Sequence, residues 1–333
     1  MRAQLLVEPA PIASRPLDLV DHPEPQPAAR EIRVRIDACA VCRTDLHLVE
    51  GDVQSGKLPV IPGHQIVGTV EQTGLDARRF QLGDRVGVGW LRHTCERCQD
   101  CRGHAENLCP RSEYTGSDAD GGFAESCVVD ENYAYPLGDV LSPFEMAPLL
   151  CAGIIGYRAL QRAQLPRNGR LGLFGFGSSA SLVARLARHR GHPFYAFSRA
   201  DTRLAEARRL GAEWTGAPDE RPFDALDAAI VFAPSGDIVP PALRAIRPGG
   251  RVVLAGIHMS DLPPLDYERH LFHEKTLTSV EANTRADGQA FLEEALAAGI
   301  KPRVQVVPLE RANEALAGLK AGELEGTAVL DCR

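Results

Sequence analysis

Hydrophobic and polar positions change their pattern near residue 150 of the chain. Before that point they alternate in short runs that are rich in β-branched residues, which is typical of strands with one buried face. The clearest runs cover 32–36, 66–73 and 84–88. Turn sequences at Pro62-Gly63 and Gly83-Asp84 separate them. The first part of the chain is therefore predicted to be an antiparallel, barrel-like domain.

After Pro148 apolar strands alternate with helices rich in Ala, Arg and Leu. This alternation is typical of a parallel sheet with crossover helices, so the second part is predicted to be an α/β domain with a doubly wound sheet. The expected strands cover 171–174, 194–197, 228–232, 252–255 and 277–280, and the expected helices cover 178–190 and 202–210.

The last 48 residues are predicted to leave that sheet near Ala286 and to complete the first domain. Their expected elements cover 289–298, 304–307, 311–319 and 327–330. The predicted domains are thus 1–150 together with 286–333, and 151–285. A length of 333 residues is consistent with two domains of ordinary size.

Composition narrows the class of protein and its partners. With 44% hydrophobic and 24% charged residues the chain resembles ordinary globular proteins. Its net charge of -7 gives no electrostatic reason for a nucleic acid or an anionic membrane as partner. No apolar run is long enough for a signal peptide or a membrane span. We expect a cytoplasmic protein that acts on a small molecule.

Four of the nine cysteines follow one another in the spacing Cys95-x2-Cys98-x2-Cys101-x7-Cys109. Four thiolates so close in a loop can close a tetrahedral site around zinc. Such a site has no open position for water or substrate, so it is expected to shape the loop. An iron-bearing site and unmetallated thiols remain the alternatives. The odd number of cysteines argues against a secreted disulfide scaffold.

A glycine-rich segment, Gly175-Phe-Gly177-Ser178-Ser-Ala180, follows the strand predicted at 171–174 and opens an Ala-rich helix. Backbone amides and the helix N-terminus hold a pyrophosphate in this strand-turn-helix context. The segment therefore predicts a dinucleotide site, with a plain tight turn as the alternative.

Three further segments carry a family resemblance. They are Cys42-Arg-Thr-Asp-Leu-His47, Pro62-Gly-His-Gln65 and Leu149-Leu-Cys-Ala-Gly153. Together with the four cysteines and the dinucleotide segment, they resemble the medium-chain zinc alcohol dehydrogenases over essentially the whole chain. The resemblance implies a GroES-like catalytic domain and a Rossmann domain. It also implies interconversion of primary or secondary alcohols with aldehydes or ketones, by hydride transfer to or from a nicotinamide cofactor.

The same resemblance implies the ligands of a catalytic zinc ion, which are Cys42, His64 and Cys151. From the residues alone, each of them can also be a buried thiol or a core imidazole. Asp45 is expected to orient the ring of His64, and Thr44 and His47 are expected to form a proton relay. Without the resemblance, Thr44 is a hydroxyl at a helix start and His47 a surface histidine.

The cofactor contacts follow in the same way. In similar enzymes the position of Arg43 reaches the pyrophosphate. Ser198 occupies the place where members that prefer NAD carry an aspartate, and Arg199 comes next. A hydroxyl with Arg199 and Arg203 favours the 2′-phosphate of NADP(H), with NAD(H) as the alternative. Asp201 opposes this unless it is the N-cap of the following helix.

One residue departs from the family pattern, because Gln65 follows His64 where a glutamate is usual. The full expectation is two zinc ions per chain, one catalytic and one structural, and a homo-oligomer, either a tetramer or a dimer. Pocket candidates are Trp90, Leu91, Tyr114 and Ile257, and His258 is a candidate nicotinamide contact. Two alternatives remain: a relative that reduces an activated alkene or an iminium group, and a zinc-binding protein without catalysis.

Overall fold

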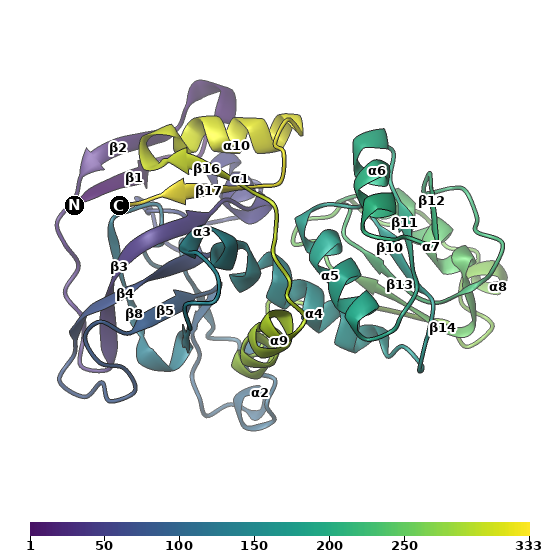
Figure 1. Cartoon of the computed structure of the whole chain (residues 1–333), viewed down its shortest axis with the longest axis horizontal. Coiled ribbons are helices and arrows are strands. Elements are labelled where there is room, and N and C mark those ends of the chain that lie inside the picture. The colour runs from purple at the N-terminus through teal and green to yellow at the C-terminus, as the bar shows by residue number, and fades with distance from the viewer. The chain divides into compact units, whose positions relative to one another are not determined.

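The computed structural model describes residues 1–333, which form two compact units (Figure 1). Unit 1 comprises Met1–Cys151, Thr284–Leu292 and Lys301–Arg333; unit 2 comprises Ala152–Asn283 and Glu293–Ile300. The predicted division differs from this one at Cys151 and 284–285, which belong to unit 1, and at 293–300, which belongs to unit 2. A bidentate ion pair links 293–300 to unit 2, because Arg190 donates to both carboxylate oxygens of Glu294 at 2.7 and 2.6 Å. No helix is both long and apolar enough to cross a bilayer.

Unit 1 is built around a largely antiparallel seven-stranded sheet in the order β16-β17-β3-β4-β5-β9, with β8 also paired to β3. Its strands are β3 (Glu31–Ala40), β4 (Ile66–Thr73), β5 (Arg85–Val88), β8 (Ser126–Asp130), β9 (Ala134–Pro136), β16 (Val304–Pro308) and β17 (Thr327–Asp331). Only β16 and β17 pair in parallel. On β3 the alternate residues Ile32, Val34 and Ile36 are fully buried in the core, as the alternation predicts.

Smaller elements surround this sheet. They are β1 (Arg2–Leu6) paired with β2 (Leu17–Asp21), β6 (Leu91–His93) paired with β7 (Glu113–Tyr114), and the helices α1 (Arg43–Glu50), α2 (Gln99–Arg102), α3 (Pro143–Met146) and α10 (Ala312–Ala321). Helix α1 was not among the expected elements. It ends at Gly51, whose φ of 83° is the left-handed conformation that glycine adopts readily.

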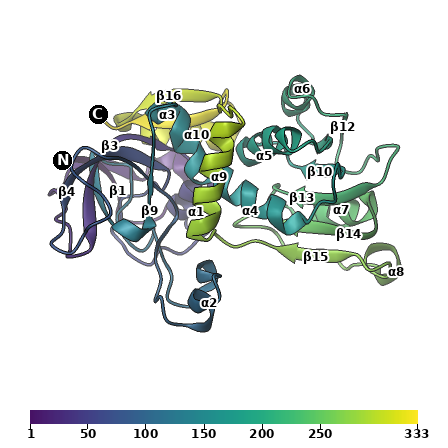
Figure 2. The ribbon, with the colours of Figure 1, turned by 60° about the horizontal axis from the view of Figure 1, so that its bottom comes forward.

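Unit 2 contains the predicted parallel sheet, in the order β12-β11-β10-β13-β14-β15. The strands are β10 (Leu171–Phe174), β11 (Phe194–Phe197), β12 (Trp214–Gly216), β13 (Leu226–Val231), β14 (Ile246–Leu254) and β15 (Thr276–Ser279). Helices α5 (Ser178–His189) and α7 (Val239–Ala245) lie on opposite faces of the sheet in Figure 1. Figure 2 shows β15 at the edge beside β14. The doubly wound architecture is confirmed.

The remaining helices of unit 2 are α4 (Ala152–Ala163), α6 (Asp201–Arg209), α8 (Tyr267–His270) and part of α9 (Arg285–Ala297). Asp201 is the first residue of α6 and Ala200 is its N-cap, so the N-cap expected at Asp201 is wrong by one position. Strand β14 begins at Ile246, earlier than predicted, because the chain passes Pro248-Gly249-Gly250 through an irregularity in the pairing with β13.

Candidate active site

One carboxylate connects the start of helix α1 to a buried histidine. Asp45 Oδ2 accepts a hydrogen bond from the backbone N–H of Cys42 at 2.8 Å, which caps the helix. Asp45 Oδ1 lies 2.8 Å from Nδ1 of His64, a residue with no exposed surface. This contact fixes the orientation of the imidazole ring, so that Nε2 faces the other way.

The Sγ atoms of Cys42 and Cys151 lie close to that Nε2 atom of His64. All three potential ligand atoms lie within 4.8 Å of one another, and Nε2 of His64 is 3.3 Å from Sγ of Cys151. In tetrahedral zinc sites with bonds of about 2.0–2.3 Å, neighbouring ligand atoms lie about 3.5–3.8 Å apart. The spacing and the chemistry of the three donors therefore fit a zinc ion with one open position.

The electrostatics of the group fit a cation as well. The pKa of the Cys42 thiol lies well below its usual value, chiefly because Cys151 donates a hydrogen bond to it and also because His64 is close. Burial lowers the pKa of His64, but Asp45 and Cys42 outweigh this effect and raise it to about 10. The site thus gathers negative charge in a buried place, where a divalent cation is strongly favoured.

The two residues expected to relay protons lie on the same helix. Thr44 is buried, and its hydroxyl is 3.6 Å from Sγ of Cys42. The Nδ1 atom of His47 lies 2.9 Å from Oδ2 of Asp52, and the His47 side chain is 13% exposed. The sequence reasoning missed Asp52. The sequence feature that could have revealed Asp52 is its place directly after Gly51, the glycine at the C-terminal end of the helix.

The surroundings of His64 include Gln65 and two aromatic rings. Gln65 is 1% exposed; its amide nitrogen donates to the carbonyl of Ala40 at 3.3 Å, and its oxygen has no hydrogen-bond partner. The ring of Trp90 meets His64 edge to face at 4.9 Å and stacks on Tyr114 at 4.9 Å. Of the pocket candidates in unit 1, Leu91 is instead a core residue with 4% exposure.

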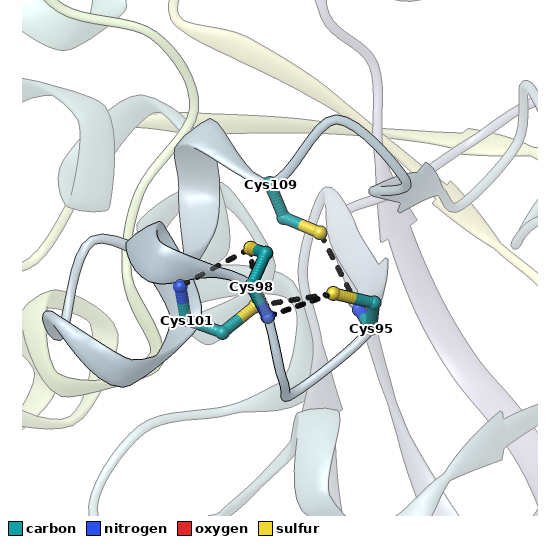
Figure 3. A group of neighbouring side chains, drawn as sticks. All are labelled: Cys95, Cys98, Cys101 and Cys109. Atoms are coloured by element: carbon teal, nitrogen blue, oxygen red, sulfur yellow. Dashed lines mark hydrogen bonds between the residues drawn. The ribbon is translucent and has the colours of Figure 1, made fainter.

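The four clustered cysteines occupy a separate lobe between β6 and β7. Figure 3 shows their side chains gathered around one point, and their sulfur atoms all lie within 4.8 Å of one another. Backbone N–H groups of Cys95, Cys98 and Cys101 donate to sulfur atoms of the group at 3.3–3.5 Å. Such N–H bonds stabilise thiolates, and the pKa of Cys95 falls to about 5, with the N–H of Arg97 as the largest cause.

Arginines near the lobe differ in their contacts with the cysteines. Arg111 forms a hydrogen bond with Cys95 that raises the pKa of the guanidinium. Arg92, by contrast, pairs with Glu31 at 3.4 Å. Two buried hydroxyls also reach the lobe, because Oγ1 of Thr94 lies 3.5 Å from Sγ of Cys101 and 2.7 Å from the hydroxyl of Tyr133.

The glycine-rich turn of unit 2 has the geometry that its motif predicts. Gly175 has φ of 86°, and a Cβ atom there would lie 2.8 Å from the backbone nitrogen of Ala233, so only glycine fits. Gly177 is the N-cap of α5, and an added Cβ would meet nothing within 4 Å, which leaves its surface open. Ala180 is fully buried where the helix packs against the sheet. Amides of the first turn lack intrahelical acceptors and are available to an anion.

The residues expected to select the cofactor follow β11 directly. Ser198 donates its backbone N–H to the carbonyl of Gly216 at 3.0 Å, and its hydroxyl accepts from the N–H of Ala200 at 3.2 Å. Arg199 is exposed. Arg203 lies 3.6 Å from Glu206, so its charge is partly offset. Arg43, in unit 1, is the first residue of α1 and directly follows Cys42.

Comparison with known proteins supplies the family. Residues 28–139 match the family described as alcohol dehydrogenase GroES-like domain, and residues 180–297 match the zinc-binding dehydrogenase family. A probable alcohol dehydrogenase of Mycobacterium tuberculosis is 47% identical over 335 residues, covering 99% of this chain and 97% of that protein. The chain belongs to the zinc-dependent medium-chain alcohol dehydrogenases.

More distant relatives agree with this family. An alcohol dehydrogenase of Geobacillus stearothermophilus is 33% identical over 325 residues, which covers 95% of this chain and 96% of the relative. The solved structure of a cinnamyl alcohol dehydrogenase from Sorghum bicolor has a TM-score of 0.89 at 26% identity, covering 99% of this chain and 97% of that one. As an alcohol dehydrogenase, the protein is an NAD(P)-dependent oxidoreductase of alcohols and carbonyl compounds.

Proposed function

We propose that Cys42, His64 and Cys151 hold the catalytic zinc ion of this alcohol dehydrogenase. The main support is that their three donor atoms lie within 4.8 Å of one another, although the residues come from segments far apart in the sequence. A zinc ion bound there supplies a Lewis acid that makes a bound alcohol more acidic or polarises a carbonyl oxygen. With three protein ligands, the fourth position is left for the substrate oxygen.

The residues of the chain divide the remaining work. Asp45 holds the ring of His64 through Nδ1, which keeps Nε2 available as a donor atom. The hydroxyl of Thr44 lies beside Cys42 and would accept the proton of the alcohol while passing its own proton on toward His47. His47, supported by Asp52, then passes a proton to solvent. This order of transfer is reversed when a carbonyl compound is reduced.

Metal content together with activity tests this assignment. The native enzyme is expected to hold two zinc ions per chain, one for each group of ligands. Cys151→Ser should hold one and lose activity by at least about a hundredfold, because a ligand of the Lewis acid is lost. The matched control is Cys127→Ala, which removes a buried thiol outside both groups. Two zinc ions in Cys151→Ser with unchanged turnover would refute the proposal.

We further propose that Cys95, Cys98, Cys101 and Cys109 bind the second zinc ion and stabilise the lobe between β6 and β7. Four sulfur donors fill a tetrahedral shell, so this ion has no position for substrate. The division of labour proposed for the chain follows: unit 1, which includes Cys151, holds both zinc ions, and unit 2 binds the dinucleotide. The homo-oligomer and the cytoplasmic location stay predictions.

For the cofactor, we propose NADP(H) bound at the turn of Gly175, Gly177, Ser178 and Ala180, with Arg43 as a pyrophosphate contact. The preference rests on the loop after β11, where Ser198 presents no carboxylate to the ribose. Arg199 is exposed beside it and forms no ion pair, so its fork of donors is available to a 2′-phosphate. Arg203 contributes less because Glu206 is close, and Asp201, which is not the N-cap of α6, opposes the preference.

Comparing kcat/KM for NADP and NAD tests the preference. The native enzyme should have a higher kcat/KM with NADP than with NAD. Ser198→Asp should change the ratio of the two kcat/KM values by at least about tenfold in favour of NAD, because a carboxylate repels the 2′-phosphate and accepts hydrogen bonds from the ribose hydroxyls. Arg199→Ala is the matched variant: it should lower efficiency with NADP and leave NAD nearly unchanged. A native enzyme that strongly prefers NAD would overturn the assignment.

A further inference from the structure

Three helices of unit 2 end around a single basic cavity. They are α5, which ends at His189, α6, which ends at Arg209, and α9, which ends at Ala297. The cavity has a volume of about 480 Å³ and is lined by Arg185, Arg188, His189, Arg209, Leu210 and Ala298. No acidic residue lines it.

The arginines of this cavity lack the acidic partners that neighbouring arginines have. Arg190 is paired with Glu294 and Arg203 with Glu206. By contrast, Arg185, Arg188 and Arg209 form no ion pair within 4 Å, although the protein carries a net negative charge. The Nε atom of Arg185 is buried and has no hydrogen-bond partner at all. A buried N–H of a charged group without an acceptor is costly, so an anion that accepts from Nε of Arg185 would be stabilised here.

The ordinary role of basic residues at helix C-termini explains only part of the arrangement. Arg188 follows that role, because it donates to the carbonyl of Leu210 at 2.6 Å. Arg185 does not, since it lies about one turn inside α5 and is half-buried. Burial, opposed by Glu206 and reinforced by the charge of Arg209, lowers the pKa of Arg185. The guanidinium groups repel one another unless an anion lies between them.

We propose that this cavity is a binding site for a small soluble anion of the di- or polyphosphate class, held by Arg185, Arg188 and Arg209. Guanidinium groups bind phosphate oxygens through pairs of N–H donors, and several of them suit a multiply charged ligand. Arg188 lies eleven residues beyond Gly177, which is about 16 Å along a helix. The site is thus at the other end of α5 from the dinucleotide turn, and its occupant is not the cofactor pyrophosphate.

Calorimetric titration with pyrophosphate at constant ionic strength tests the site. The full-length, zinc-loaded enzyme is first saturated with NADPH, so that pyrophosphate cannot enter the turn at Gly175–Ala180. Zinc content is measured after the titration, because pyrophosphate chelates metals. Native enzyme should bind one pyrophosphate per chain. Arg185→Gln and Arg209→Gln should each weaken its Kd by about tenfold, the loss expected for a charge-assisted contact.

Arg208→Gln is the matched control, because Arg208 is the neighbour of Arg209 on α6 but donates to Thr215 and does not line the cavity. Its Kd should equal that of the native enzyme. Equal weakening by Arg208→Gln would mean general surface attraction and would overturn the proposal, as would absent binding at millimolar pyrophosphate. Arg209 is exposed, so Arg209→Gln remains informative even if Arg185→Gln does not fold. Binding is measured directly, so the result does not depend on the zinc chemistry.

Discussion

Gln65 has the least satisfied side chain beside the proposed catalytic zinc site. Its amide nitrogen is bonded to Ala40, while its oxygen is buried and without a donor. With the neutral amide of Gln65, the surroundings of Cys42, His64 and Cys151 carry one negative charge fewer than with the glutamate that is usual in the family. The net charge around the metal is therefore set partly by a residue that is not a ligand.

Restoring that charge should change the pH dependence of turnover. In Gln65→Glu, an added carboxylate favours the protonated form of any neighbouring group that must lose a proton. The pKa of that neighbouring group therefore rises. The rising limb of the plot of kcat against pH should move to higher pH by about one unit. Gln4→Glu is the matched control, because Gln4 is equally buried and its amide also donates to a backbone carbonyl, that of Leu309. Profiles that coincide for Gln65→Glu and the native enzyme would contradict this expectation.

At the scale of an element, the lobe between β6 and β7 is supported by more than its cysteines. Thr94 connects Cys101 to the hydroxyl of Tyr133. The guanidinium of Arg285 lies over the Tyr133 ring at 4.8 Å, and Arg285 also donates its backbone N–H to Glu106 at 2.9 Å. The cluster is thereby tied to the start of α9 through side chains that carry no metal.

Removing the hydroxyl of Thr94 should loosen the metal in this lobe. Thr94→Val keeps the shape of the side chain but deletes the contact to Cys101, and supporting contacts of this kind alter metal affinity by about 10–100-fold. Zinc release to a chromogenic chelator should be faster by a similar factor. Thr115→Val is the control, because Thr115 is buried with a hydroxyl that has no partner. Equal release rates for the two variants would show that Thr94 has no such role.

Elements with a regular apolar pattern could be predicted closely from the sequence, and those with buried polar residues could not. Strands β4, β10 and β11 have the predicted bounds. Helix α1 was missed because Thr44 and Asp45 are among its buried residues, which hides the apolar stripe. Helix α4 was missed because it contains two glycines, which are poor helix formers. One of them, Gly156, allows close contact with Val183.

For the whole molecule, the sequence alone could not show which distant residues meet. The four clustered cysteines are close in the chain, so spacing predicts their site. Cys42, His64 and Cys151 come from three separate segments, and only the family resemblance brought them together. The partnership of His47 with Asp52, and the cavity of Arg185, depend on how helices end and pack, which periodicity does not encode.

The order of strands in unit 1 has a consequence for synthesis of the protein. Strand β17 pairs with the Ala38–Ala40 end of β3 and also holds β16, so the sheet joins one of the earliest strands to the last. Unit 2 is almost contiguous and has most of its chain by Asn283. During translation, the Ala38–Ala40 edge of β3 therefore stays without its partner strand until nearly three hundred further residues have been synthesised. During that interval the partly synthesised barrel exposes unpaired backbone N–H and C=O groups. Chaperones or rapid completion of folding are then needed to prevent strand pairing with a neighbouring chain.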